Sequence, residues 1–344
     1  MKKQSKLLAL LLACAMTLAL SACGGNSATT STPAGSAAPA ASGSAAATGD
    51  KTYTIGICQL VQHNALDAAT KGFKDALTEK LGDKVKFDEQ NAAGDSATCA
   101  TICNQFVSSK VDLIMANATP ALQAATAATN SIPILGTSVT DYGTALSIAD
   151  WKGTTGTNVT GTADLAPLDK QAEMIKTLFP DKKNVGLLYC SAEPNSKYQS
   201  TEITKYLTDA GYTCKEYTFA DSNDVAAVTK TACDESDVLY VPTDNTAASC
   251  AESINNIAEP AKVPIVAGES GICTGCGVAT LSIDYYDLGV VTGNMAYEVL
   301  VNGADPATTE IQFAPKTTYQ YMADRCEKLG VKVPSDYVAI EAEK

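Results

Sequence analysis

The sequence predicts an α/β fold of two similar lobes, each built on a doubly wound parallel β-sheet. The first observation is an internal repeat, in which three apolar segments recur in the same order at similar offsets: 55–57 with 185–187, 112–121 with 237–247, and 132–136 with 263–267. The repeated runs are short and unalternated, which suits strands buried on both faces. Each run leads into a polar turn or a helical pattern, and this alternation of strands and helices predicts parallel strands.

In the first lobe, apolar periodicity and turn residues define the elements. The helix over 65–81 is justified by one apolar face, formed by Leu66, Ala69, Phe73 and Leu77. Ser96 is the expected N-cap of the next helix, and Thr119 followed by Pro120 reads as an N-cap and a first helical residue. Residues 141–158, which contain Trp151, are expected to form an exposed excursion. The expected elements are strand 54–59, helix 65–81, strand 85–91, helix 96–110, strand 112–116, helix 120–129 and strand 132–136.

The second lobe repeats this pattern and adds a long helix. Gly211 is expected to end one helix and Gly303 the last one, in which Val291, Met295 and Val299 point inward. The expected elements are helix 167–178, strand 184–190, helix 197–210, strand 213–219, helix 222–233, strand 237–242, helix 246–259, strands 263–267 and 280–284, and helix 286–301.

The first 22 residues read as a targeting segment, with Lys2, Lys3 and Lys6 preceding an apolar run over 7–20. The run ends in Leu20-Ser21-Ala22-Cys23, which resembles a bacterial lipobox and implies lipidation of Cys23. An ordinary secretory signal with an incidental cysteine is the alternative. Residues 23–51 are rich in Gly, Ser, Thr, Ala and Pro and are expected to be a disordered linker. We therefore expect a body anchored by lipid at the outer face of the bacterial cytoplasmic membrane.

Charge and cysteine content limit the possible partners. The formal net charge is −13 and Arg325 is the sole arginine, so neither nucleic acid nor an anionic phosphate ligand is expected. Ten cysteines remain beyond Cys14 and Cys23, and many lie in apolar runs, as small buried hydrophobes do. The motif Cys273-Thr274-Gly275-Cys276 is a lone CxxC without a second pair or a nearby histidine, so no metal site is expected. A local disulfide or two free thiols remain open there.

Polar turns follow the expected strands, and in doubly wound sheets ligands bind beyond the carboxyl ends of the strands. The first-lobe turns offer Thr119, Ser138 and Thr140, together with helix N-termini that favour a carboxylate. The second-lobe region offers carboxylates that suit an ammonium group, from Asp244, Glu269 and Asp284. This division matches a zwitterionic amino acid, although the same residue types also cap ordinary βα turns. His63, the only histidine, stands in the first βα turn and is read either as a structural residue or as a ligand contact.

Several of these segments resemble the type I substrate-binding lipoproteins of ABC importers, in the family associated with tryptophan and tyrosine uptake. The similarity spans roughly residues 53–315, and its most specific part is VPTDNT at 241–246. Further matching segments include Gln59 with His63 and Ala65-Leu66-Asp67, Gln90 to Asp95, Ala118 to Ala121, Val139-Thr140-Asp141, Asn158 to Gly161, Glu193-Pro194-Asn195-Ser196, Ala267-Gly268-Glu269 and Ile283 to Tyr286.

The resemblance implies a three-crossover hinge between lobe 1, residues 52–162 plus 285–310, and lobe 2, residues 163–284 plus 311–344. It also implies an ABC permease and its ATPase as partners, a monomeric protein without a cofactor, and an aromatic amino acid as the ligand. The ligand-binding residues expected from the turns and the resemblance together are Gln59, His63, Thr119, Ser138, Thr140, Asn195, Asp244, Asn245, Glu269 and Asp284.

An enzyme is not expected, because the chain has no GxSxG, no HExxH and no defined pair of catalytic carboxylates. A tethered sensor that presents its ligand to a membrane receptor has the same sequence features as an importer component. A neutral sugar or a nucleoside is the alternative ligand class, although few Trp and Phe residues are available to stack on a sugar ring.

Overall fold

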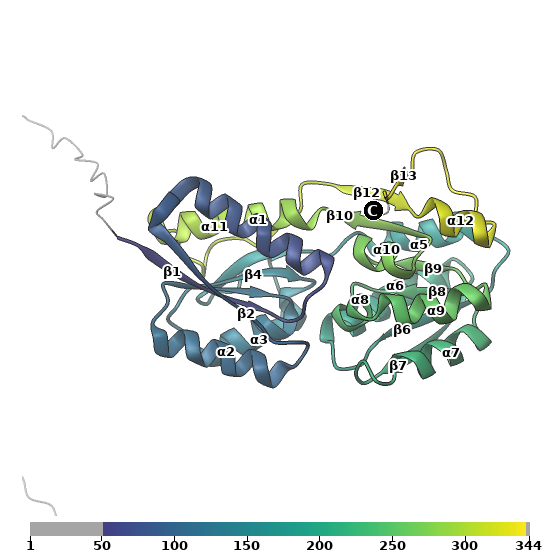
Figure 1. Ribbon diagram of the computed structural model, residues 1–344, viewed down its shortest axis with the longest axis horizontal. Helices are drawn as coiled ribbons and strands as arrows, with labels where there is room; N and C mark the ends of the chain where they lie inside the picture. The colour runs from purple at the N-terminus through teal and green to yellow at the C-terminus, as the bar shows by residue number, and fades with distance from the viewer. Residues whose placement is uncertain (1–50, 342–344) are drawn as a thin grey trace, which may run out of the picture. The chain divides into compact units, whose positions relative to one another are not determined.

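The computed structural model describes residues 51–341, which contain two β-sheets with helices on both faces of each (Figure 1). The expected targeting segment, the lipidated cysteine and nearly all of the linker lie outside the described residues. Two hydrophobic clusters belong to each sheet, one on each face. Strands in which apolar residues do not alternate with polar ones thus bury both of their faces. The expectation of two parallel-sheet lobes is confirmed.

The first lobe contains a six-stranded parallel sheet in the order β11-β5-β4-β3-β1-β2. Its elements are β1 (Tyr53–Gln59), α1 (Asn64–Leu81), the short 3-10 helix η1 (Gly82–Lys84), β2 (Val85–Asn91), α2 (Ser96–Ser109), β3 (Leu113–Asn117), α3 (Thr119–Ala128), β4 (Ile134–Val139), α4 (Tyr142–Leu146), β5 (Val159–Ala163), α11 (Tyr285–Val301) and β11 (Gln312–Phe313).

The second lobe contains a seven-stranded sheet in the order β13-β12-β10-β9-β8-β6-β7, in which β12 runs antiparallel to β10. Its elements are α5 (Leu168–Leu178), β6 (Asn184–Cys190), α6 (Pro194–Asp209), β7 (Thr213–Phe219), α7 (Val225–Glu235), β8 (Val238–Val241), α8 (Asn245–Ser249), α9 (Ala251–Ala261), β9 (Ile265–Ala267), α10 (Ser270–Cys276), β10 (Ala279–Ile283), β12 (Thr317–Tyr321), α12 (Ala323–Leu329) and β13 (Val338–Ala339).

The internal repeat has a structural counterpart in strand order and in packing. The series β2, β1, β3, β4 in the first sheet corresponds to β7, β6, β8, β9 in the second. Both central strands carry a glycine, Gly56 in β1 and Gly186 in β6, because neighbouring side chains occupy the place of a Cβ. At Gly56 that neighbour is the ring of Phe106, which packs over the sheet from α2.

The chain passes between the sheets three times. It leaves the first sheet after β5, returns from β10 through α11, and leaves again between β11 and β12 (Figure 1). Helix α11 then packs closely along α1, and Met295 and Val299 are buried between this helix and the sheet, whereas Val291 is only partly buried.

Several sequence predictions differ from the structure. The N-cap of α2 is Asp95 rather than Ser96, since the Asp95 carboxylate accepts from the Thr98 N–H. Thr119 is the first residue of α3, and the cap position belongs to Ala118, at φ 91°. The expected helix 246–259 is interrupted at Cys250 and forms α8 and α9.

The expected exposed excursion is only partly exposed. Residues 142–146 form the short helix α4, and Tyr142 is 1% exposed. Its ring stacks on Trp151, with ring centroids 6.1 Å apart, so the single tryptophan packs against the first-lobe core. No element was predicted where α10, β12, α12 and β13 occur.

The ten cysteines of the described residues are unpaired; eight are buried and Cys214 and Cys250 are partly buried. This agrees with their interpretation as small hydrophobic side chains. Cys273 and Cys276 are buried thiols of α10. Within residues 51–341 no helix combines the length and the apolar character needed to cross a membrane.

We predict that Gly72→Ala destabilises the fold. A Cβ at Gly72 would collide with the backbone carbonyl oxygen of Tyr286, at one of the points of close approach between α1 and α11. Overpacking of this kind costs about 1–3 kcal/mol of the free energy of unfolding, and alanine gains roughly 1 kcal/mol over glycine in a helix. Because the collision is with backbone atoms, which cannot turn aside, we expect a cost near the upper end of this range and a net loss of about 2 kcal/mol. Denaturant unfolding measures the change.

The matched control is Thr78→Ala on the exposed face of the same helix, which should change the free energy of unfolding by less than about 0.5 kcal/mol. Equal stability of the Gly72→Ala variant and the unmodified protein would contradict the close packing of α1 and α11.

Candidate functional site

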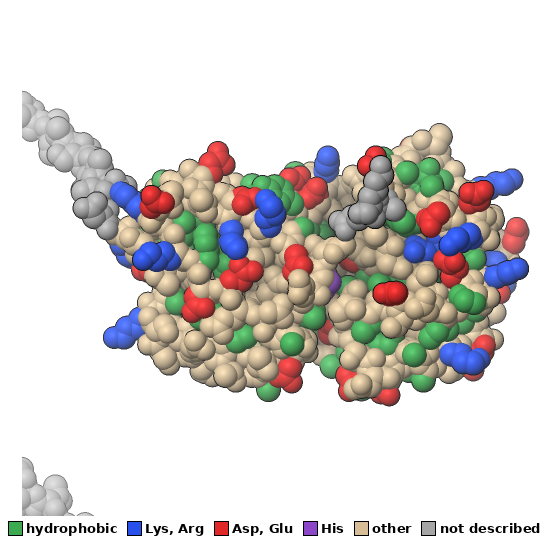
Figure 2. Space-filling model, viewed as in Figure 1, with side chains coloured by type: hydrophobic (Ala, Val, Ile, Leu, Met, Phe, Trp, Pro, Cys, Tyr) green, Lys and Arg blue, Asp and Glu red, His purple; other side chains and the backbone are tan. Residues whose placement is uncertain are grey.

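The carboxyl ends of the strands of the two sheets face each other across the seam between the lobes. Two hydrogen bonds cross this seam: His63 Nε2 lies 3.3 Å from Asn245 Oδ1, and Gln199 Nε2 donates to Thr140 Oγ1 at 3.3 Å. Both lobes also line a cavity of about 230 Å³, with Leu60 and Pro120 on one side and Glu193 on the other. A hollow between the lobes is visible in Figure 2. Several of the turns expected from the sequence therefore meet along this seam.

Glu193 organises the second-lobe side of the crevice. Its carboxylate is 4% exposed and accepts five hydrogen bonds from three residues. Oε2 accepts from Asn195 Nδ2 at 3.0 Å and from the N–H and Nδ2 of Asn245 at 3.0 and 2.7 Å, while Oε1 accepts from the N–H and Oγ1 of Thr246, both at 2.8 Å. Asn195 Nδ2 also donates to the Thr243 carbonyl at 3.1 Å. The side chains of Asn195 and Asn245 are thus held in fixed orientations.

Asp164 connects the crossover segments to both lobes. It follows β5 on the first crossover and accepts from Tyr285 Oη, at the start of the second crossover, at 2.9 Å. It also accepts from Thr140 Oγ1 at 3.2 Å, and this hydroxyl in turn accepts from Gln199 of the second lobe. Burial raises the pKa of Asp164 to about 6, against the effect of its two hydroxyl donors.

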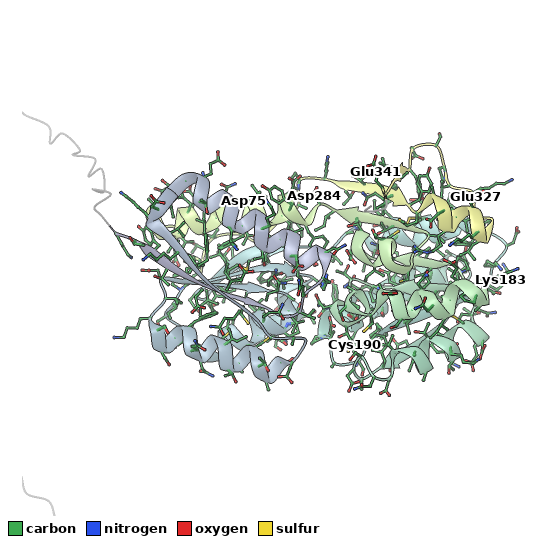
Figure 3. The ribbon with its side chains drawn as sticks, in the orientation of Figure 1. Asp75, Lys183, Cys190, Asp284, Glu327 and Glu341 are labelled. Atoms are coloured by element: carbon green, nitrogen blue, oxygen red, sulfur yellow. The ribbon has the colours of Figure 1, made fainter. Side chains whose placement is uncertain are left out.

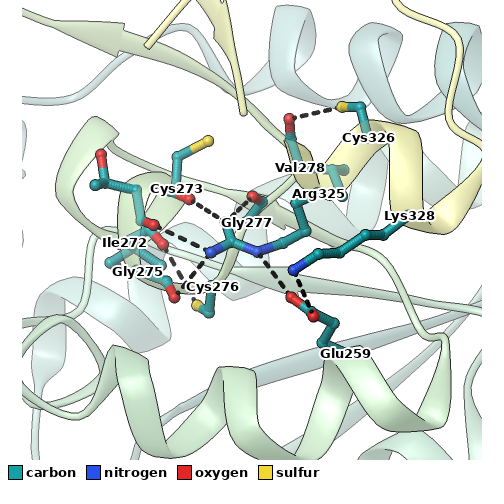
Figure 4. Close-up of polar contacts among 11 residues, drawn as sticks. Glu259, Ile272, Cys273, Gly275, Cys276, Gly277, Val278, Arg325, Cys326 and Lys328 are labelled. Atoms are coloured by element: carbon teal, nitrogen blue, oxygen red, sulfur yellow. Dashed lines mark hydrogen bonds and ion pairs between the residues drawn. The ribbon is translucent and has the colours of Figure 1, made fainter. Parts of the chain in front are cut away.

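Glu269 lies at the N-terminus of α10, where its carboxylate accepts from the N–H groups of Gly271 and Ile272. Burial raises the pKa of Glu269 to about 7, and the negative charge of Asp164 adds to the effect. At the other end of this helix, the Arg325 guanidinium donates to the carbonyls of Cys273, Thr274, Gly275 and Gly277 (Figure 4). The only arginine therefore stabilises the C-terminus of α10 and does not serve as an anion clamp.

Asp244 is buried inside the second lobe. Its carboxylate accepts from the N–H groups of Ala247 and Cys190, each at 2.7 Å. Cys190 lies at the edge of this lobe that faces the first (Figure 3). Burial raises the pKa of Asp244, and the neighbouring Glu193 charge acts in the same direction. Both carboxylate oxygens therefore have protein donors.

Two first-lobe residues expected in the site carry hydroxyls without a partner. Thr119 is 2% exposed and Ser138 is 6% exposed, and neither oxygen has a hydrogen-bond partner among the described residues. Ser138 adopts φ 54°, next to a shift in the register between β4 and β5. Such backbone irregularities re-aim a side chain and are concentrated at functional sites.

Two other expected residues lie apart from these groups. Gln59 is buried within the first lobe, where it donates to Asp67 at 2.6 Å and accepts from Thr70 at 2.6 Å. Asp284 is exposed and caps α11 by accepting from the Asp287 N–H at 3.0 Å (Figure 3). It borders a groove of about 560 Å³ on the crossover side of the molecule, together with Asn64 and Lys316.

The structure thus brings His63 together with Asn245, which shares the Glu193 carboxylate with Asn195, and Thr140 together with Asp164. Sequence reasoning did not place Asp164, Glu193 or Gln199 among the ligand-binding residues. For Glu193 a signal existed, since it begins the turn after β6. For Asp164 none was available, because its partner Tyr285 is 121 residues away in the chain. Within the described range, no cluster of three His, Cys, Asp or Glu side chains could hold a metal ion.

Comparisons with known proteins agree with this arrangement. Residues 54–344 match the family described as ABC transporter substrate binding protein. A relative named tyrosine-binding protein, from Clostridioides difficile, is 41% identical over 265 residues, covering 75% of this chain and 76% of the relative. A crystal structure from Streptococcus pneumoniae, of an ABC domain in complex with L-Trp, is 34% identical, with a TM-score of 0.79 over 83% of this chain and 97% of the other.

A further crystal structure shows the open state of a similar protein. It is the ligand-free, open structure of a substrate-binding protein with adhesive properties from Clostridium difficile, 36% identical, with a TM-score of 0.65 over 85% of this chain and 100% of the other. Its TM-score is lower than that of the tryptophan complex although its identity is slightly higher, as a change in the angle between lobes would produce. In the present structure, hydrogen bonds join the two lobes across the seam.

The family match covers nearly all of the described chain, and the two-lobe fold and the crevice are those of a binding protein. Proteins of this family bind solutes and are not enzymes, so the expectation that the chain is not an enzyme is confirmed. The resemblance noted from the sequence is confirmed as well. The chain belongs to the family of ABC transporter substrate-binding proteins.

Proposed function

We propose that this protein captures an aromatic amino acid between its two lobes and delivers it to an ABC permease and its ATPase. The observation that carries this proposal is a pair of buried carboxylates, Asp164 on the first crossover and Glu269 at the N-terminus of α10, at 4% and 2% exposure. Neither forms a salt bridge within residues 51–341. A buried carboxylate without a cation is unfavourable, and a ligand ammonium group supplies the missing charge.

Hydroxyl groups of the first lobe suit the ligand carboxylate. Thr119 and Ser138 offer hydroxyl donors without protein partners, and Thr119 begins α3, whose N-terminal N–H groups and dipole favour an anion. A zwitterion therefore has a complementary group for each of its charges. In this proposal Gln59 supports the first-lobe turn from inside, Asp244 holds the second-lobe turn, and Asp284 caps α11 outside the crevice.

Two relatives support the aromatic class of ligand. The Clostridioides difficile relative is named for tyrosine, and the Streptococcus pneumoniae structure contains L-Trp. Anchoring through Cys23 at the outer face of the cytoplasmic membrane, and function as a monomer, remain part of the proposal. A lipid at Cys23 and a linker over 23–51 would keep the binding lobes close to the permease.

We predict that aromatic amino acids stabilise the protein against heat more than the other amino acids, common sugars or nucleosides. A ligand that binds the folded state stabilises it by RT ln(1 + [L]/Kd), about 2.7 kcal/mol at 100 Kd. A thermal-shift screen measures this effect.

Glu269→Gln and Asp164→Asn should each weaken binding by about 10- to 150-fold, the effect of losing a hydrogen bond to a charged group.

The matched control is Glu252→Gln, an exposed carboxylate of α9, which should leave the affinity unchanged. A thermal shift with sugars alone would reject the amino-acid ligand. Full affinity in both carboxylate variants would remove Asp164 and Glu269 from the ammonium role.

We predict that the ligand-free protein loses stability as the pH rises from about 4.5 to 7, in part through Glu269. Its folded-state pKa of about 7 lies above the ordinary value of 4.5, so in this range the folded protein retains a proton that the unfolded chain has released. Raising the pH therefore favours the unfolded state. The difference corresponds to on the order of 3 kcal/mol, at about 1.4 kcal/mol per tenfold change in proton affinity.

Denaturant unfolding at pH 5 and pH 8 measures this contribution in the unmodified protein and in Glu269→Gln. The variant should lose less stability between the two pH values, whereas Glu252→Gln should follow the unmodified protein. Identical pH dependence in all three proteins would show that Glu269 is not held in a costly ionised state.

A further inference from the structure

The two ring nitrogens of His63 have different surroundings. Nε2 faces Asn245 Oδ1 across the seam at 3.3 Å, while Nδ1 is buried and has no hydrogen-bond partner among the described residues. Buried polar atoms in folded proteins are nearly always hydrogen-bonded. An unpaired ring nitrogen at the seam between the lobes therefore points to a partner that arrives with the ligand.

The contacts of Asn245 determine which of these nitrogens carries the proton. Its Nδ2 lies 2.7 Å from Glu193 Oε2, which also accepts from the Asn245 backbone N–H. Since a carboxylate only accepts, the amide must turn its NH₂ toward Glu193 and its oxygen toward His63. Nε2 must then be the donor, and Nδ1 of the neutral ring is an acceptor.

The charge of His63 agrees with this assignment. Burial is the main cause that lowers the pKa of His63 below its ordinary value of 6.5, so the ring is neutral at neutral pH. Asn195 provides a second acceptor of the same kind, because its Nδ2 donates to Glu193 and to the Thr243 carbonyl, and its Oδ1 is buried without a partner in the described part of the chain.

The carboxylates whose charges act on His63 are Glu193 and Asp67, and neither Asp164 nor Glu269 is among them. The ammonium group of the ligand carries a full positive charge and interacts more favourably with a carboxylate than with a neutral imidazole. A neutral nitrogen acceptor matches a neutral donor, such as the phenol O–H of tyrosine or the indole N–H of tryptophan.

We propose that His63 Nδ1 accepts a hydrogen bond from the side-chain donor of the bound aromatic amino acid, and so selects tyrosine and tryptophan over phenylalanine. Glu193 is a positioning residue for this contact, because it orients the amide of Asn245, and that amide fixes the tautomer of His63. The inference rests on the proposed function, because it requires an aromatic amino acid in the crevice.

The first test compares ligands of nearly equal shape by calorimetric titration of the full chain. L-tyrosine and 4-amino-L-phenylalanine carry a donor at the ring position that 4-fluoro-L-phenylalanine fills without one. An acceptor left unpaired in a buried site should weaken binding of the fluoro compound by about 10- to 100-fold relative to tyrosine. 1-Methyl-L-tryptophan should lose affinity relative to L-tryptophan for the same reason.

The second test uses a matched pair of variants. His63→Gln can place an amide N–H near the position of Nε2 and keep the contact to Asn245, but it leaves no acceptor at the Nδ1 position. His63→Asn can place its amide oxygen near Nδ1. We expect the preference for tyrosine over 4-fluoro-L-phenylalanine to fall to within about threefold in His63→Gln and to persist in part in His63→Asn.

The outcomes separate this inference from the proposed function. Binding of no aromatic amino acid would overturn both. Equal affinity of the unmodified protein for tyrosine and its fluoro analogue would overturn the inference alone. An equal loss of affinity for tyrosine, phenylalanine and the fluoro analogue in His63→Gln would instead place the ammonium group, not the side-chain donor, at Nδ1. Unfolding curves of both variants exclude a loss of fold as the cause.

Discussion

Five donors converge on the carboxylate of Glu193, and the geometry of the crevice depends on this interaction. A charged acceptor at 4% exposure is stable only if its oxygens are saturated with hydrogen bonds, and here the N-termini of α6 and α8 supply the donors. Because the amide groups of Asn195 and Asn245 are committed to Glu193, their oxygens are left to face away from it. Glu193 therefore determines that Asn195 and Asn245 present amide oxygens, and not NH₂ groups, away from it, although its own oxygens are fully used by protein donors.

The electrostatics of the crevice favour a cationic group on the ligand. Asp164 and Glu269 are buried near each other and neither forms an ion pair within residues 51–341, so two like charges lie in a region of low dielectric. Protonation relieves this cost, as their raised pKa values indicate, and a bound ammonium group relieves it without a proton. Since Asp164 also accepts a hydrogen bond from Tyr285 of the second crossover, the proposed ammonium site is continuous with the segments that connect the lobes.

The sequence was sufficient for the repeated elements because their signals are local. Each of these signals depends only on residues within one segment: unalternated apolar runs, helical periodicity, and glycines such as Gly56 and Gly186. All the strands expected in the two copies occur in the structure. Tyr142 was misjudged because its polar, glycine-rich neighbours suggest an exposed segment, although its hydroxyl donates to the Thr162 carbonyl and its ring lies over Gly136 and Gly161. Asp164 could not be found at all, since its environment is created by residues from three distant segments.

Corresponding positions of the two lobes do not have the same role. Thr119 and Asp244 occupy corresponding turns, after β3 and β8, and the sequence invites the same ligand-facing role for both. In the first lobe the hydroxyl of Thr119 is left without a protein partner. In the second, the backbone N–H groups of Ala247 and Cys190 use both oxygens of Asp244, and the next residue, Asn245, reaches the other lobe. The duplicated backbone thus supplies equivalent positions, but hydrogen-bond saturation decides which side chain at each position remains available to a ligand.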